Sequence, residues 1–378
     1  MTALAALAFA AWLWLLFGHD RFWHSGPELP RTAPAMFAGV DVIVPARDEA
    51  QHIAGCLASL LGQEHGGKVR VFLIDDRSRD ATLEIARGLA AGARGERLRV
   101  IPGAPAPPGW SGKLWALEQG ITAAASDAPA PWLLLTDADI VHAPAHLAVL
   151  MAKAEGERLD LASEMVALRC RSLAERALVP AFVFFFQLLY PFAAVNNSKR
   201  RVAAAAGGTI LVRRSALERA GGLAAIRGAL IDDVTLAKAV KPVGRIWLGH
   251  TRLAVSERAY PGFADIWRMI ARTAFVQLRY SALALIGTLL GMSFLFLLPP
   301  LFALCGVGIA RWIGLAGWAL SMVLYWPSLA RYRRLPLWAL ALPLIAGFYL
   351  AATFGSAIDH WLGRGQIWKG RAYRGAET

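Results

Sequence analysis

Short apolar runs alternate with amphipathic stretches through the middle of the chain. The apolar runs at residues 40–46, 69–76, 98–103 and 132–137 have the length and residue types of buried strands. Helical periodicity follows them over residues 49–61, 80–93, 113–125 and 143–155. Strands that alternate with helices predict an α/β domain, with a parallel sheet covered by helices on both faces.

Longer uncharged runs lie at both ends of the chain, at residues 2–17, 282–310, 313–330 and 335–358. Each is near the roughly 17–25 residues needed to cross a bilayer. The first run lacks a basic segment before it and a small-residue cleavage site after it, which favours an anchor over a signal peptide. We therefore predict four parts: a membrane helix at 1–20, an α/β domain at 38–280, about three spans within 281–358, and a basic tail at 359–378.

Arginines predict which side of the membrane the α/β domain occupies. Arg21 and Arg31 follow the first apolar run, so the positive-inside rule places the following domain in the cytoplasm, as in a multi-pass protein of a bacterial inner membrane. The arginines in "RYRR" (331–334) favour the same side. Three later spans would put the basic tail outside, unless Pro299 and Pro300 break the run 282–310 into a hairpin or a re-entrant segment. The topology of the C-terminal region stays open.

The amino-acid composition favours a membrane over a nucleic acid as the partner of this protein. The hydrophobic fraction is 56% and the formal net charge is +13, which suits a protein that lies against anionic lipid headgroups. The basic residues form no stripe and accompany no nucleic-acid-binding module, so we expect no nucleic-acid partner. The three cysteines, Cys56, Cys170 and Cys305, have neither metal-ligand spacing nor the pattern of a disulfide framework.

Acidic residues follow several of the predicted strands. Asp75 and Asp76 end the second strand, and Asp137 and Asp139 follow the fourth. Carboxyl ends of parallel strands share one edge of a sheet, where ligands bind. In an extended segment Asp137 and Asp139 would face one space, which suits Mg²⁺ or Mn²⁺. The alternative is that these acids only start turns and cap helices.

Six segments, taken in order, resemble the family-2 glycosyltransferases of GT-A fold, the nucleotide-diphospho-sugar transferases, over residues 38–280. They are "VIVPARDE" (42–49), "IDDRSRDAT" (74–82), "GKLWAL" (112–117), "TDADI" (136–140), "GGTILVRRSALERAGG" (207–222) and "DDVTLAKAVKPVG" (232–244). The membrane ends, residues 272–278 and the tail "QIWKGRAY" are similar to the hopene-associated glycosyltransferases of the HpnB type. The motif Gln-x-x-Arg-Trp of polymer-making members is absent, which favours transfer of a single sugar.

The resemblance implies a role for particular residues. Asp139 would hold Mg²⁺ or Mn²⁺, and Asp137 would contact the metal or the ribose. Asp233 or Asp232 would be the catalytic base, and the family often has Glu where this sequence has Asp232. The residues implied in nucleotide-sugar binding are Pro45, Arg47, Glu49, Asp76, Lys113, Asp137 and Arg272.

Several of these residues could instead have ordinary structural roles. Lys113 fits a solvated surface lysine, and Arg272 fits a lipid-headgroup contact. Asp232 with Asp233 fits an N-cap that also complements the helix dipole. His142 and His146 have a metal-compatible spacing but lack a Glu partner nearby in sequence, so ordinary helix residues are favoured.

The function that this resemblance implies is inverting transfer of one sugar from a nucleotide sugar, UDP-linked by preference, to a membrane lipid such as a hopanoid. The apolar stretch 178–195 would then cradle the acceptor at the interface, or else be a buried core helix. Two rivals remain. One is a nucleotidyltransferase, which would release diphosphate, and the other is a non-catalytic membrane scaffold with a degenerate domain.

Overall fold

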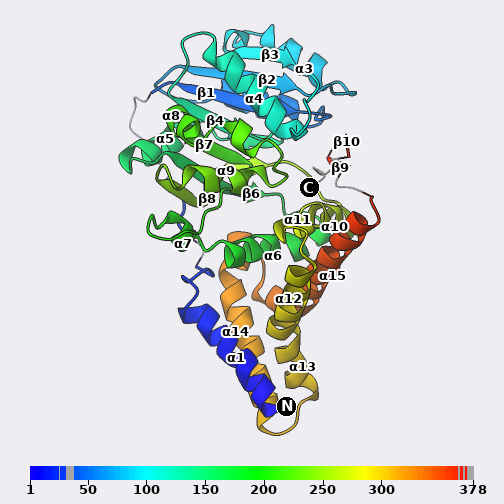
Figure 1. Cartoon of the computed structure of the whole chain (residues 1–378). Helices are drawn as coiled ribbons and strands as arrows, with labels where there is room; N and C mark the ends of the chain where they lie inside the picture. Colours follow the sequence, from blue (N-terminus) through cyan, green and yellow to red (C-terminus); the bar gives the residue numbers. More distant parts are fainter. Residues whose placement is uncertain (25, 31–37, 365–366, 369–370, 373–378) are drawn as a thin grey trace. The chain divides into compact units, whose positions relative to one another are not determined.

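The computed structural model describes residues 1–24, 26–30, 38–364, 367–368 and 371–372. The chain forms two compact units, each assembled from separate stretches of sequence. The α/β unit comprises Gly26–Arg169 and Ala194–Arg258, and the helical unit comprises Met1–Ser25, Cys170–Ala193 and Ala259–Arg374 (Figure 1). The boundaries 1–20, 38–280, 281–358 and 359–378 stay predictions, and most of the basic tail lies outside the described residues.

An eight-stranded sheet forms the centre of the α/β unit, in the order β3-β2-β1-β4-β7-β6-β8-β5. The strands are β1 (Val40–Ala46), β2 (Val69–Asp75), β3 (Leu98–Pro102), β4 (Trp132–Thr136), β5 (Ile140–His142), β6 (Leu161–Leu168), β7 (Thr209–Arg213) and β8 (Ile246–Ser256). The four predicted strands, β1 to β4, are present and mutually parallel, and the α/β class is confirmed.

The expectation of a wholly parallel sheet is wrong, because β7 runs antiparallel to both β4 and β6. Thr209, the first residue of β7, pairs with Thr136, the last residue of β4. The antiparallel direction therefore brings Gly207 and Gly208 to the carboxyl end of β4. A parallel β7 would have placed them at the opposite edge of the sheet.

Four helices lie within the predicted stretches: α2 (Ile53–Leu61), α3 (Thr82–Ala90), α4 (Gly112–Ala125) and α5 (His146–Gly156). The chain also forms α7 (Phe192–Asn196), α8 (Arg214–Arg219), α9 (Asp232–Val240) and short 3-10 turns at Gly95–Arg97 and Leu223–Ile226. Helix α4 begins where the Ser111 hydroxyl accepts a hydrogen bond from Leu114 N, which satisfies one of the free N–H groups of its first turn. All residues of β1, β2 and β4 are buried, so the core lies against these strands.

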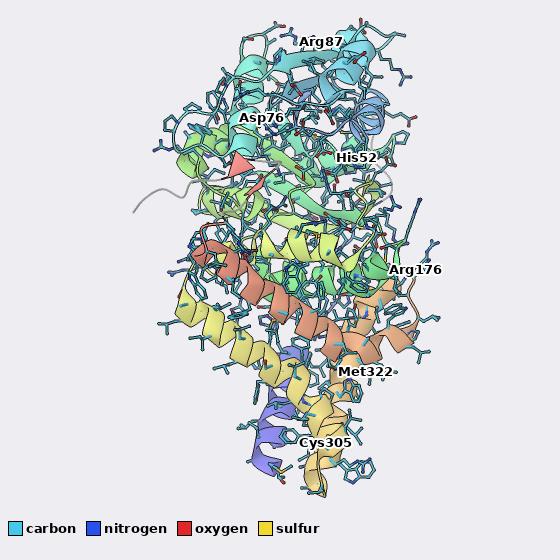
Figure 2. All side chains as sticks on the ribbon, turned by 90° about the vertical axis from the view of Figure 1, so that its right-hand side faces the viewer. His52, Asp76, Arg87, Arg176, Cys305 and Met322 are labelled. Atoms are coloured by element: carbon cyan, nitrogen blue, oxygen red, sulfur yellow. The ribbon has the colours of Figure 1, made fainter. Side chains whose placement is uncertain are left out.

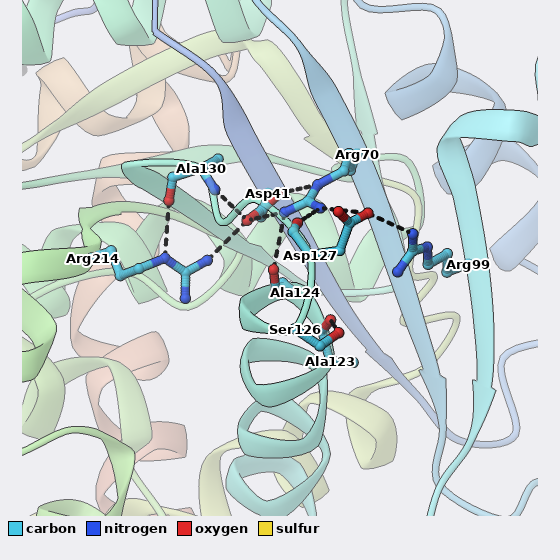
Figure 3. A network of polar contacts seen from close by, with 9 residues as sticks. All are labelled: Asp41, Arg70, Arg99, Ala123, Ala124, Ser126, Asp127, Ala130 and Arg214. Atoms are coloured by element: carbon cyan, nitrogen blue, oxygen red, sulfur yellow. Dashed lines mark hydrogen bonds and ion pairs between the residues drawn. The ribbon is translucent and has the colours of Figure 1, made fainter.

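An ion-pair network holds the amino ends of β1 and β2 together (Figure 3). Arg70 donates to both carboxylate oxygens of Asp41, at 2.7 and 2.9 Å, and Arg214 donates to Oδ2 of Asp41 at 2.8 Å. Asp41 is fully buried. Its charge is therefore paired by two arginines, as a buried carboxylate requires. The network lies at the edge of the sheet opposite to the acids predicted to bind ligand.

The helical unit contains the apolar runs. Its α-helices are α1 (Thr2–Phe17), α6 (Leu173–Leu189), α10 (Phe263–Ala271), α11 (Ala274–Gln277), α12 (Ala282–Met292), α13 (Leu298–Cys305), α14 (Ile309–Arg331) and α15 (Leu342–Trp361). The π-helical turn η3 (Ser293–Leu297) joins α12 to α13, and the 3-10 segment η4 (Pro336–Ala341) precedes α15. The two-residue strands β9 (Ile367–Trp368) and β10 (Arg371–Ala372) pair with each other. Three stretches are long and apolar enough to cross a membrane: Ala282–Cys305, Ile309–Arg331 and Pro336–Trp361. The predicted C-terminal apolar helices are therefore present.

Helix α6 accounts for most of the apolar stretch 178–195. A capping box of Ser172 and Glu175 starts it. Phe184 and Phe185 lie in the core of the helical unit with Tyr325 of α14. This packing favours the buried-helix interpretation of the stretch, and the helix ends at Leu189 rather than continuing to residue 195.

Candidate active site

A recess of about 310 Å³ lies at the carboxyl ends of the central strands of the α/β unit. Four charged side chains line it, from α4, the end of β4 and the start of α9: Lys113, Asp137, Asp232 and Asp233. Pro45 of β1 and Gly207 also line the recess. The structure therefore brings together five of the residues implied by sequence, from segments that are far apart in the chain.

Lys113 is the cation of this recess. Its Nζ lies 2.8 Å from Oδ1 of Asp137 and 3.0 Å from Oδ2 of Asp232. Burial alone would lower the pKa of Lys113, but these two carboxylates raise it above its usual value, so the ammonium stays charged. The interpretation of Lys113 as a solvated surface lysine is wrong, because the side chain joins two acidic segments inside the recess.

Asp232 and Asp233 form the first turn of α9. The N-cap residue is Ile231, which makes no side-chain cap bond, so neither aspartate is the N-cap. Both lie in the first turn, where they complement the helix dipole as the alternative also expected. Burial raises the pKa of Asp233 to about 7, and the neighbouring Asp232 adds to this effect. Lys113 opposes the rise. Asp233 can thus exchange a proton close to neutral pH, as a general base must.

Asp137 and Asp139 lie in a tight turn between β4 and β5, closed by a hydrogen bond from Ile140 N to Asp137 O at 3.2 Å. The expectation that they lie on one extended segment is wrong, since β4 ends at Thr136. Their carboxylates contact different cations. Burial raises the pKa of Asp137, whereas Arg258 and Ser256 outweigh burial at Asp139 and lower its pKa.

Arg258 is a site residue that the sequence did not reveal. It follows β8 and donates to Oδ1 of Asp139 at 3.3 Å and to Oε1 of Glu49 at 2.5 Å. Ser256, the last residue of β8, donates to Oδ2 of Asp139 at 2.6 Å. If residues 246–256 had been predicted as a strand that ends at the same edge of the sheet as β4, Ser256 and Arg258 could have been named as site residues.

The loops after β1 and β2 are joined to each other. Arg47 Nη1 donates to the Asp76 carbonyl at 2.8 Å and lies 3.5 Å from the Asp76 carboxylate. Backbone N–H groups of one loop donate to side chains of the other, from Asp48 to Ser78 at 3.0 Å and from Ala50 to Asp80 at 3.0 Å. The side chains of the Asp-Asp-x-Ser-x-Asp segment therefore brace the loop that carries Arg47.

The acidic residues fit a divalent metal whose coordination is completed by substrate. Among the described residues, no three His, Cys, Asp or Glu side chains surround a common metal position. Mg²⁺ is typically held by one or two carboxylates together with substrate phosphates. Asp137 and Asp139 provide such a pair of hard oxygen donors at the strand end.

His142 and His146 belong to a buried polar chain. His142 lies in β5 rather than in a helix, and its Nδ1 is 3.0 Å from Nδ1 of His146. His146 Nε2 lies 2.6 Å from Oε2 of Glu164, and His142 Nε2 lies 3.1 Å from the Thr136 hydroxyl. The carboxylate partner that the local sequence lacked comes from β6. The chain of contacts reaches Thr136, the residue before Asp137, whose hydroxyl also donates to Gly208 O at 2.8 Å.

Arg272 belongs to the helical unit, where it is the C-cap residue of α10 and is exposed. Its implied contact with a nucleotide sugar stays a prediction.

Three comparisons relate the chain to known proteins. Residues 41–221 match the family described as "Glycosyl transferase family 2". An N-acetylglucosaminyltransferase of Neorhizobium galegae is 42% identical over 64 residues, which are 16% of this chain and 15% of the relative. Another of Rhizobium leguminosarum bv. viciae is 31% identical over 96 residues, 24% of this chain and 23% of the relative. The chain thus matches less than a quarter of the length of either protein.

The fold is similar to that of a mannosyltransferase from Pyrobaculum calidifontis, solved in complex with GDP-Man and Mn²⁺. The TM-score is 0.57 at 20% sequence identity, covering 94% of this chain and 97% of the other. The α/β fold of this protein is therefore GT-A-like, and residues 41–221 resemble a glycosyl transferase family 2 domain.

Proposed function

We propose that the protein is an inverting glycosyltransferase that moves one sugar from a nucleotide sugar, UDP-linked by preference, to a membrane lipid. The observation that carries the proposal is the recess in which Lys113, Asp137, Asp232 and Asp233 meet. It combines a carboxylate that titrates near neutral pH with Asp137, one of the two acids proposed to hold a metal–diphosphate group.

Asp233 is the proposed base. It removes the proton from the acceptor hydroxyl, whose oxygen attacks the anomeric carbon of the donor. The bond from that carbon to the diphosphate oxygen breaks, and its electron pair leaves with the nucleoside diphosphate. Attack opposite the leaving group inverts the anomeric centre in one step and requires no enzyme nucleophile.

The donor would be held at the ends of β1, β2 and β4. Asp76 and Glu49 are proposed to contact the nucleotide, with Arg47 holding the Asp76 loop in place. Asp139, with Asp137, would hold Mg²⁺ or Mn²⁺, which when bound neutralises the diphosphate leaving group as a Lewis acid. The mannosyltransferase of similar fold binds GDP-Man with Mn²⁺, so GDP-sugars are the second donor class to test.

A lipid acceptor is proposed because the same chain carries three helices long and apolar enough to cross a membrane. The resemblance of residues 272–278 and 366–373 to hopene-associated enzymes makes a hopanoid the first acceptor to test, although residues 366, 369–370 and 373 lie outside the described part. A bacterial inner membrane, with the α/β unit in the cytoplasm, is the proposed location.

Calorimetry on detergent-purified protein tests the donor site. We expect UDP to bind in the presence of Mn²⁺ and to lose at least about tenfold in affinity, or 1.4 kcal/mol, in Asp139→Asn. Glu84→Gln, on the surface of α3, is the matched control and should bind like the wild type.

Product analysis separates the rival functions. Incubation with UDP-sugars and a lipid extract should release UDP and yield a glycosylated lipid. Release of inorganic diphosphate instead would favour a nucleotidyltransferase. Failure to bind either UDP or GDP, with or without Mn²⁺, would overturn the proposal and leave the scaffold interpretation.

A further inference from the structure

The helices α12 to α14 form an antiparallel hairpin that defines two faces of the helical unit. A Cβ atom at Gly314 of α14 would lie 2.7 Å from Ala303 N and 2.8 Å from Pro299 O, so the two arms touch through their backbones. Ser281 at the start of α12 and Arg331 at the end of α14 therefore lie on one face, which we call the Arg331 face. The turn before Gly308 lies on the other, the Gly308 face.

Helix α1 runs in the same direction as α14. Ala5 packs with Phe302 and Ala310 near the Gly308 face, and Trp12 Nε1 donates to Leu295 O at 2.8 Å farther along. Phe17 therefore ends α1 towards the Arg331 face. The chain leaves the helical unit for the α/β unit from that face.

The last apolar stretch starts on the Arg331 face. Arg334 N donates to Leu329 O of α14 at 2.9 Å, so the chain turns back on the end of α14 before η4 begins. The six residues of η4 can then descend only about 12 Å, at roughly 2 Å per residue. This distance is less than half of a hydrocarbon core of about 30 Å. Leu342, the first residue of α15, cannot have reached the Gly308 face.

The same stretch also ends on the Arg331 face. The ring of His360 stacks on Tyr280, with centroids 4.4 Å apart, and Tyr280 directly precedes Ser281. Trp361 packs edge-on against Phe275 at 5.6 Å. Figure 2 labels Cys305 at the lower end of the helical unit, whereas α15 rises obliquely to the upper end.

We propose that Pro336–Trp361 is a re-entrant element embedded in one leaflet and not a membrane span. Its length of 26 residues would allow a crossing, but both of its ends lie on the Arg331 face. The partner it fits is the acyl-chain layer of the leaflet at that face. The side chains that it exposes to this layer are Leu337, Leu340, Leu344, Phe354, Ile358 and Trp361.

The charges agree with this arrangement. Arg331, Arg333 and Arg334 precede the element and Arg364 follows it, at the level where headgroups would lie. With α15 re-entrant, α12–α13 and α14 form the C-terminal crossings, and the tail emerges on the side from which the chain enters the α/β unit. The basic tail then no longer conflicts with the positive-inside rule. The inference does not depend on the proposed function.

Cysteine labelling in spheroplasts and inverted vesicles of a bacterial host tests the inference. Cys56 and Cys170 are replaced by alanine, which leaves Cys305, exposed beside the Gly308 face, as the reporter of that side. Two further variants also carry Cys305→Ser and a single new cysteine, either Ala93→Cys in the α/β unit or Thr378→Cys in the tail. An impermeant maleimide then reports the accessible side of each residue.

We expect Thr378→Cys to react from the same side as Ala93→Cys, and Cys305 from the opposite side. Reaction of Thr378→Cys from the side of Cys305, or equally from both sides, would overturn the proposal. Protease access to a C-terminal epitope on the otherwise unchanged chain locates the tail independently if the cysteine variants fail to accumulate in the membrane. Donor binding is not measured, so failure of the topology and failure of the proposed function are distinguishable.

Discussion

Arg258 donates a hydrogen bond to Asp139, with 3.3 Å between Nη2 and Oδ1. Arg258 lies beyond residues 41–221, the part that matches the glycosyltransferase family, yet it contacts the acid predicted to hold the metal. The same guanidinium also binds Glu49, so one cation neutralises two acids from different strand ends. A metal ion that binds Asp139 must compete with this contact.

Removal of Arg258 should strengthen metal binding in the absence of nucleotide. We expect Arg258→Met to raise the affinity for Mn²⁺ about tenfold, since a charge-assisted hydrogen bond contributes roughly 1.5–3 kcal/mol. Electron paramagnetic resonance titration of free Mn²⁺ measures this affinity. Arg87→Met, at an exposed position of α3, is the control. Unchanged or weaker Mn²⁺ binding in Arg258→Met would show that the arginine does not compete for Asp139.

The pKa of about 7 at Asp233 predicts how sugar transfer depends on pH. A base must be deprotonated, so the initial rate should rise with pH up to about 7 and level off above it. Asp232→Asn removes the neighbouring negative charge that helps to raise this pKa. The acidic limb of the profile should therefore move to lower pH in that variant, while activity persists.

The same pair of variants identifies the base. We expect Asp233→Asn to lose about 10²–10⁴ in transfer rate, the usual contribution of a general base, with UDP affinity retained. Rates from radiolabelled donor and calorimetric UDP binding are measured on both variants. An inactive Asp232→Asn beside an active Asp233→Asn would assign the base to Asp232.

Gly207 leaves space for substrate beside the base. A Cβ atom there would lie 3.2 Å from Oδ2 of Asp233 and 3.5 Å from Lys113 Nζ. We expect Gly207→Ala to lower the transfer rate at least about tenfold without unfolding the protein, because a small misplacement at a reacting centre is costly. Gly88→Ala is the control, since a Cβ atom there meets nothing within 4 Å. Equal rates in both variants would contradict the expectation.

The Asp41 network should determine stability rather than function. Asp41→Asn leaves Arg70 and Arg214 with a neutral partner, and breaking a buried ion pair costs about 3–5 kcal/mol of unfolding free energy. Asp127→Asn is the control in the same network (Figure 3), because the Asp127 side chain is 60% exposed and should contribute at most about 1 kcal/mol.

Thermal unfolding followed by tryptophan fluorescence compares these two variants with the wild type. UDP affinity measured well below the midpoint should be unchanged in both variants, since the network lies at the edge of the sheet opposite to the recess. Equal midpoints for Asp41→Asn and Asp127→Asn would refute the stabilising role.

The sequence by itself determined the elements whose signals are local. The strands at 40–46, 69–75, 98–102 and 132–136 are short apolar runs, and the helices that could cross a membrane are long apolar runs. Hydrophobicity along the chain is therefore enough to predict both. Acids directly after β2 and β4 lie at one edge because parallel strands end together. Strand order by itself indicated Asp137, whereas Pro45, Lys113, Asp232 and Asp233 were named in advance only through the resemblance to family-2 glycosyltransferases.

Tertiary structure decided every feature that depends on pairing between distant segments. The antiparallel insertion of β7 carries Gly207 to the site, the turn at Asp137–Asp139 gives each of the two acids a different cation as partner, and Arg258 reaches Asp139 from 119 residues away. The proposed return of α15 to the Arg331 face also depends on tertiary structure, because the length and hydropathy of a helix indicate only whether it could cross a membrane. The positions of its two ends follow from packing against α11 and α14, and the hydrophobic pattern along the chain does not predict that packing.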